Sequence, residues 1–177
     1  MKNIEYFYNV IYYFFYRGTI KFAKGSIYLG MPIVIIFYFF INRIPSIRKY
    51  YVTEENDNPL DVAIKRTKKS IENPKNGLAK MLGGGISISV VMTLYIGIYN
   101  IIRNLIFPTF EDSFAYVLMI TATLAFITDV FLSQIYNKDE KYIKEFNKRK
   151  GWWRVKWSII TALTPFIVIW FAIATAR

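Results

Sequence analysis

Asp129 is the residue within the apolar stretches of this chain whose side chain could carry proton or ion chemistry. It lies in LAFITDVFLSQ, residues 124–134, inside a run long enough to cross a membrane. Carboxylates inside membranes commonly serve proton relays or ion sites. They can also hold helices together through hydrogen bonds. No other Asp or Glu lies inside a predicted span, so we favour a helix tether. Ion or proton movement, and contact with a partner subunit, are the alternatives.

The sequence offers Asp129 several candidate partners. Ser133 follows it by one helical turn, and Ala122 and Ala125 place small residues on the same stripe, where another helix can approach closely. Asp129 lies seven residues before Tyr136, about 11 Å from that end of the span. An unpaired charge inside a membrane costs about 2.5 kcal/mol or more, so a partner is required. We expect it to be a hydroxyl or a basic side chain from a neighbouring span.

A second polar feature runs along one face of the predicted span 83–107. Its members are Ser89, Thr93, Gly97, Asn100 and Asn104. Such a stripe can be a seam for packing another helix, and it then needs nothing more. It can also line a pore, but a pore requires copies from several subunits or matching polar stripes on other helices. We favour the seam.

No motif in the sequence indicates catalysis. The chain has no cysteine and no histidine, which removes disulfides, thiolate chemistry, imidazole bases and typical zinc sites. GGGIS at residues 83–87 lacks the Gly-Lys-Ser/Thr of a phosphate loop, and it favours a hinge or a close backbone approach. The acidic group Glu54, Glu55, Asp57 and Asp61 is typical of a solvated loop. We therefore predict no enzyme, no cofactor and no metal site.

The elements that position these residues are predicted membrane helices. The chain has 177 residues, 54% of them hydrophobic, and the apolar residues form long blocks. Three blocks, 83–107, 113–136 and 155–176, exceed the roughly 20 residues that a span needs. A shorter block, 26–41, contains Gly30 and Pro32, and it predicts either a fourth span or a broken helix. The fold class is all-α, a polytopic membrane protein of about four spans in one domain, 1–177.

The N-terminal block 3–24 has a different pattern. Ile4, Phe7, Ile11 and Phe14 share one helical face, and a face rich in Tyr and charged residues lies opposite. This pattern is typical of a helix lying in the plane of the membrane interface. We therefore predict an interfacial amphipathic helix preceding the spans.

Basic residues concentrate in the connections 43–82 and 137–154, and the net charge is +11. By the positive-inside rule both connections face the cytoplasm or matrix, where they meet anionic headgroups. Residues 59–72 predict a short amphipathic helix that begins at Pro59, with Asn58 as N-cap, and stops before Asn73-Pro74. The predicted lipid contacts are Lys65, Arg66, Lys68, Lys69, Lys148, Arg149, Lys150 and Arg154. Trp152, Trp153 and Trp157 are expected at the headgroup level.

These features predict a non-catalytic integral membrane subunit that packs into a larger assembly. Its expected partners are anionic lipids and other membrane subunits, or copies of itself, and not nucleic acid. The alternatives are a homo-oligomeric pore, which includes a holin-like protein, and a small proton or cation carrier that uses Asp129. The expected location is a plasma or energy-transducing membrane, such as a bacterial inner membrane or the mitochondrial inner membrane.

Overall fold

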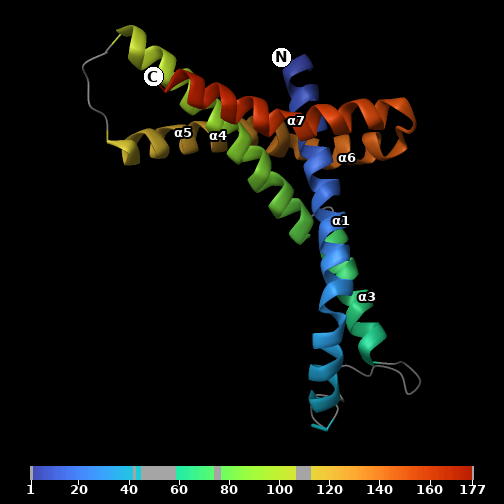
Figure 1. Cartoon of the computed structure of the whole chain (residues 1–177). Helices are drawn as coiled ribbons and strands as arrows, with labels where there is room; N and C mark the ends of the chain where they lie inside the picture. The colour runs from blue at the N-terminus through green and yellow to red at the C-terminus, as the bar shows by residue number, and fades with distance from the viewer. Residues whose placement is uncertain (1, 42, 45–58, 74–76, 107–112, 177) are drawn as a thin grey trace. The chain divides into compact units, whose positions relative to one another are not determined.

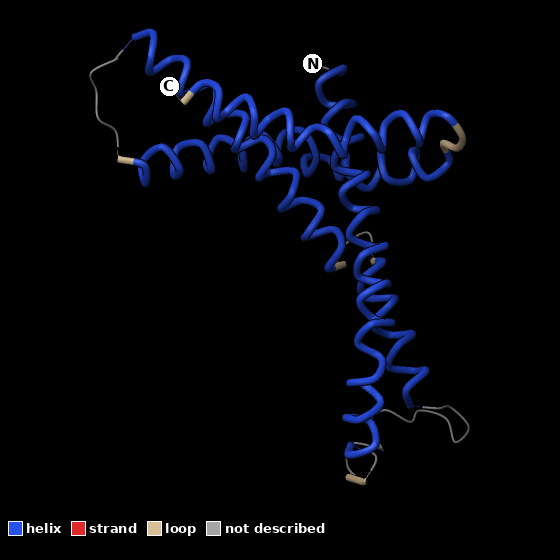
Figure 2. The backbone as a smooth tube through the Cα atoms, in the orientation of Figure 1, coloured by secondary structure: helices blue, strands red, loops and turns tan. Residues whose placement is uncertain are grey.

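The computed structural model describes residues 2–41, 43–44, 59–73, 77–106 and 113–176. Across these ranges the regular structure is helical, and no strand occurs among the described residues (Figure 2). This confirms the all-α prediction. The described residues form two compact units, Met1–Tyr16 with Leu82–Arg177 and Arg17–Met81, called here the first and the second unit. The expectation of one domain stays a prediction.

The first unit contains the long apolar helices, α4 (Leu78–Ile106), α5 (Phe114–Asp129) and α7 (Trp152–Thr175) (Figure 1). Among the described residues, three helices are long and apolar enough to cross a membrane, namely α4, α7 and the helical stretch Phe114–Lys148 that begins with α5. They coincide with the three longest predicted spans. The fourth predicted span, 26–41, stays a prediction.

The predicted span 113–136 contains a break that its sequence does not reveal. After α5 the chain makes one π-helical turn, Val130–Gln134, then a 3₁₀ turn, Ile135–Asn137, and continues as α6, Lys138–Lys148. Tyr136 and Asn137 both have positive φ angles, 61° and 51°. Two consecutive left-handed residues cannot continue a right-handed hydrogen-bond ladder. The helical stretch Phe114–Lys148 is therefore kinked between α5 and α6.

Helix α1 (Lys2–Ile41) is one helix of 40 residues that joins the predicted blocks 3–24 and 26–41, which were expected as separate elements. The interfacial placement of 3–24 stays a prediction. Within the first unit its tyrosine-rich face is buried, including Asn9, Tyr12 and Tyr16. On the opposite face Ile4 and Phe7 are 66% and 43% exposed, whereas Ile11 is buried. The tyrosine-rich face packs inside the first unit, where its hydroxyl and amide groups find partners.

Aromatic side chains join this part of α1 to α6 and α7. The ring of Phe146 lies 5.5 Å from those of Tyr6 and Tyr13 and 5.2 Å from that of Trp153. Trp157 contacts Tyr6 at 6.3 Å between centroids. Trp153 and Trp157 are half-buried in these contacts, while Trp152 is 76% exposed. Their expected place at the headgroup level stays a prediction.

The second unit pairs residues 17–41 of α1 with α3 (Pro59–Glu72) and the first turn of α4. The bounds of α3 agree with the helix predicted from Pro59 and Asn73-Pro74. Lys24 forms an ion pair with Glu72, and the Thr19 hydroxyl donates to the carbonyl of Ala79 at 3.0 Å.

Candidate functional site

Asp129 is the last residue of α5, and only 3% of it is exposed. Its Oδ1 accepts hydrogen bonds from the Tyr8 hydroxyl at 2.5 Å and the Ser133 hydroxyl at 2.9 Å. Its Oδ2 accepts one from the Gln134 amide at 2.7 Å. Three donors converging on two oxygens form the environment that an ionised carboxylate needs in a buried position.

The π turn explains how two of these donors reach Asp129. In a regular α-helix Ser133 lies one turn beyond Asp129, while Gln134, five residues beyond, faces away. Widening the turn to π geometry brings the fifth residue back to the same side, so both side chains can donate. The Ser133 hydroxyl also lies 2.8 Å from the backbone carbonyl oxygen of Asp129, so its single proton is shared between this carbonyl and the carboxylate. The local break in the helix thus builds half of the site.

Helix α1 supplies the other half through Tyr8 and Asn9. Tyr8 reaches the carboxylate, and the Asn9 amide donates to the carbonyl of Leu132 at 2.8 Å, within the π turn. The same amide donates to the carbonyl of Glu5. Both residues are buried. The Asn9 side-chain oxygen has no hydrogen-bond partner within the described part of the chain. The N-terminal helix is therefore joined to the α5–α6 break through two adjacent side chains.

A second polar layer borders this cluster on the α6 side. Lys138 donates to the Glu5 carboxylate at 2.8 Å, and the Tyr142 hydroxyl donates to the same carboxylate at 3.2 Å. The hydrogen bond from Lys138 holds the pKa of Glu5 below its ordinary value of 4.5. Both charged side chains are about one quarter exposed, at 25% and 24%. This ion pair fastens the start of α1 to the start of α6.

The lowered pKa of Glu5 predicts an acid-sensitive contribution to stability. A carboxyl whose folded-state pKa is depressed stabilises fully above its unfolded value, and the contribution is lost as the pH falls through the folded value. We expect the Glu5→Gln variant to melt at a lower temperature than wild type at neutral pH. This difference should shrink as the pH falls below 4.5. Melting in mild detergent across this range measures both effects.

The matched control is Glu145→Gln. Glu145 also pairs with a cation, Arg149 at 3.1 Å, but both side chains are largely exposed, and such a pair contributes little. Equal losses for the two variants would contradict the role given to the Glu5–Lys138 pair.

The polar stripe of α4 divides into two halves. The Asn100 and Asn104 amides donate to the carbonyls of Ala172 and Thr175 at 3.2 and 3.0 Å. A Cβ on Gly97 would come within 2.5 Å of the Phe171 ring, so α7 approaches α4 closely there. Ser89 and Thr93 donate to carbonyls of their own helix. The second half of the stripe thus contacts α7, whereas among the described residues the first half forms no hydrogen bond to another helix.

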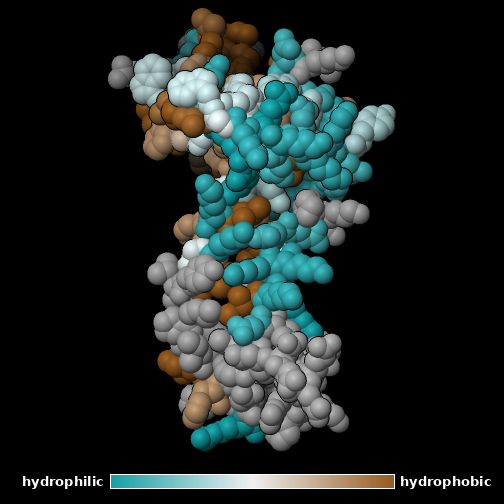
Figure 3. Space-filling view, turned by 90° about the vertical axis from the view of Figure 1, so that its right-hand side faces the viewer, coloured by the Kyte–Doolittle hydropathy of each residue, from teal (hydrophilic) through white to brown (hydrophobic). Residues whose placement is uncertain are grey.

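The predicted lipid-contact residues lie mostly on the surface. Lys65, Arg66 and Lys69 of α3 are exposed, and Lys68 is half-buried. Lys148, Arg149 and Lys150 are exposed at the turn between α6 and α7, and Figure 3 shows hydrophilic side chains gathered where this turn faces the viewer. Arg154 is half-buried and donates to the carbonyl of Asn147 at 2.8 Å. Arg154 is therefore engaged in closing this turn.

The sequence anticipated Ser133 near Asp129 but missed Tyr8, Asn9 and Gln134. The expected basic partners lie elsewhere, because Arg154 bonds to Asn147 and the Lys156 ammonium sits 5.9 Å from the ring centroid of Trp157. Of the acidic group, Asp61 is exposed on α3, while Glu54, Glu55 and Asp57 lie outside the described residues. Asn58, the expected N-cap, also lies outside them. An asparagine beside tyrosines on a predicted interfacial helix was the one available signal for a buried face.

No protein-family model, curated protein or solved structure matches the chain.

Proposed function

We propose that this protein is a non-catalytic integral membrane subunit that packs against other membrane proteins and supports their assembly. The observation that carries the proposal is the small buried share of its apolar helices. In each of the three candidate spans only 17% of the most apolar 18-residue window is buried within the chain. The remaining apolar surface must be shielded from water. In an assembly, other proteins contact some of these faces and lipid contacts the rest.

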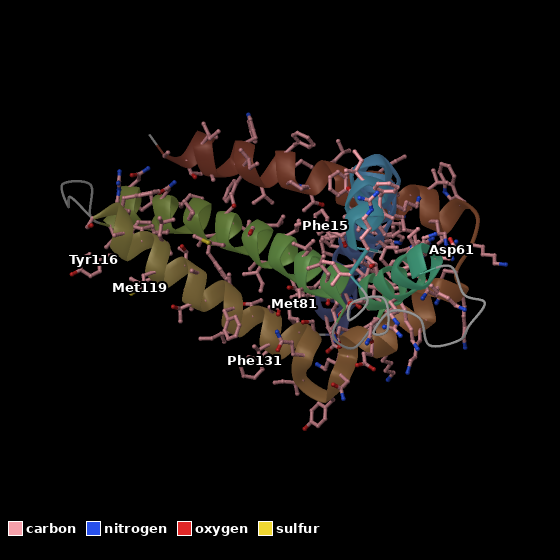
Figure 4. All side chains as sticks on the ribbon, turned by 90° about the horizontal axis from the view of Figure 1, so that it is seen from below. Phe15, Asp61, Met81, Tyr116, Met119 and Phe131 are labelled. Atoms are coloured by element: carbon pink, nitrogen blue, oxygen red, sulfur yellow. The ribbon has the colours of Figure 1, made fainter. Side chains whose placement is uncertain are left out.

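The exposed faces carry large side chains suited to such contacts. Tyr116 and Met119 on α5 and Phe131 in the π turn point away from α4 and α7 (Figure 4), and they are 66%, 61% and 60% exposed. On α7, Phe166 and Trp170 are 71% and 70% exposed. Aromatic residues and methionine are the types that interfaces between proteins favour.

The intramembrane polar groups support a structural role. Asp129 has three donors from the chain itself, and Gly97, Asn100 and Asn104 contact α7. A tethered carboxylate and a filled seam stabilise one helix arrangement, and this is what a scaffold subunit requires. The exposed lysines and arginines of α3 and of the α6–α7 turn are placed to bind anionic headgroups on the cytoplasmic or matrix side. The second half of α1 serves as the fourth span in this proposal, in a plasma or energy-transducing membrane.

Site-specific photo-cross-linking in the native membrane tests the proposal. A photoreactive residue replaces Phe166, which is exposed on α7, and in a matched variant it replaces Val168, which is 9% exposed on the same helix. We expect position 166 to capture a fixed set of other membrane proteins and position 168 to capture none. Capture of lipid alone, or only of a second copy of this chain, would overturn the proposal.

A homo-oligomeric pore is the second candidate, favoured by one observation. Ser89 is exposed on α4, and within the part of the chain that the structure describes its hydroxyl bonds only to its own helix, as does that of the half-buried Thr93. Copies of this half-stripe facing one another would make a polar lining. Capture of a second copy at Ser89, together with measurable conductance in planar bilayers, would favour the pore over the subunit.

A further inference from the structure

A groove lies among α4, α5 and α7 of the first unit, away from the Asp129 cluster. Its cavity volume is about 440 Å³. The lining residues come from the last turns of α4, the first turns of α5 and the last turns of α7, and they include Thr93, Ile96, Arg103, Phe114, Ile169 and Ile173. Phe114, Ile169 and Ile173 are 71%, 49% and 67% exposed, so the rim of the groove opens toward the surroundings of the helices.

Arg103 is the one charged residue of the lining, and it lies near the end of α4. Within the described ranges no carboxylate pairs with it. The neighbouring amides of Asn100 and Asn104 each donate one hydrogen bond to a carbonyl of α7. A guanidinium remains charged in proteins and presents paired donors that match phosphate oxygens. The end of the groove at Arg103 therefore suits a phosphate group.

The length of the groove fits the remainder of a lipid. Ten residues separate Arg103 from Thr93, a rise of about 15 Å along α4. This equals about half of the roughly 30 Å hydrocarbon core, the depth of one leaflet. An acyl chain lying between Arg103 and Thr93 would contact the apolar walls over its whole length.

We propose that this groove binds one anionic phospholipid, its phosphate on Arg103 and one acyl chain along the groove towards Thr93. The lipid belongs to the leaflet at this end of the first unit, opposite the α6–α7 turn with its basic residues. The acyl chain would fill the groove that α4, α5 and α7 leave open between them. The site is separate from the basic surface expected to meet anionic headgroups on the other side.

Native mass spectrometry of protein released from bilayers of phosphatidylcholine and phosphatidylglycerol tests this inference. We expect wild type to retain phosphatidylglycerol, and Arg103→Gln to retain about tenfold less, the factor that one charge-assisted hydrogen bond is worth. Arg103→Lys should retain an intermediate amount. Thr93→Phe, which fills the inner end of the groove but keeps the charge, should also lower retention. Lys144→Gln removes one positive charge from exposed α6, and it should behave as wild type.

Equal retention by wild type and Arg103→Gln, each with the same melting temperature, would overturn the site. Equal losses in Arg103→Gln and Lys144→Gln would overturn it as well, because they would show that only net charge matters. Undiminished retention in Thr93→Phe would place the acyl chain elsewhere and contradict the groove.

Discussion

Replacing Asp129 by alanine should lower the free energy of unfolding by about 3 kcal/mol. The substitution leaves the Tyr8 hydroxyl and the Gln134 amide without the acceptor that they have in the folded protein. Buried donors without an acceptor are costly, while the relief from burying a charge offsets part of the loss. Reversible unfolding of the purified protein in mixed detergent micelles measures this difference.

The Tyr8→Phe variant provides the matched control, because it removes a single hydroxyl from the same contact. We expect it to lose about 1 kcal/mol in wild type and almost nothing in an Asp129→Ala background. This double-mutant cycle isolates the interaction between the two helices. Additive losses would show that the 2.5 Å contact contributes no coupling, and they would contradict the tether.

Gly83→Ala should cost about 2 to 3 kcal/mol, because the added methyl group meets backbone. A Cβ on Gly83 would lie 2.8 Å from Cα and 2.9 Å from the backbone nitrogen of Tyr16. Backbone atoms cannot relieve this clash by changing rotamer as a flexible side chain can, so α4 and α1 must move apart at this point. The loss of stability is measurable in the same detergent unfolding experiment.

Gly85→Ala is the control, two residues away on the same helix. A Cβ at Gly85 meets nothing within 4 Å. Alanine is the better helix former, so this variant should be as stable as wild type or gain up to about 1 kcal/mol. If the two variants proved equally stable, the close approach of α1 to α4 at Gly83 would be refuted.

The sequence was informative wherever a pattern is local. Long apolar blocks identified α4, α5 and α7, and Pro59 with Asn73-Pro74 set the bounds of α3. The three glycines at residues 83–85 indicated a close backbone approach, which the geometry at Gly83 bears out. Each of these inferences rests on residues that are neighbours in the chain, where steric rules and helical period act directly.

What the sequence could not provide is the contact of α1 with the α5–α6 break. Tyr8 lies 121 residues from Asp129 in the chain, and a tyrosine-rich helical face has the same pattern at a membrane interface and inside a bundle. The π turn has no sequence signature here, so the sequence did not indicate Gln134 as a partner of Asp129. The α4 stripe shows the same limit, because only packing against α7 distinguishes Asn100 and Asn104 from Ser89.

Proton flux in reconstituted vesicles tests most directly whether the buried carboxylate holds helices together or moves ions. Wild type and Asp129→Asn are compared with protein-free vesicles, using a trapped pH indicator and an imposed proton gradient. The account predicts that wild type and Asp129→Asn leak no faster than empty vesicles, while Asp129→Asn melts at a lower temperature than wild type. A gradient-driven flux in wild type that Asp129→Asn abolishes, with its melting temperature unchanged, would contradict it.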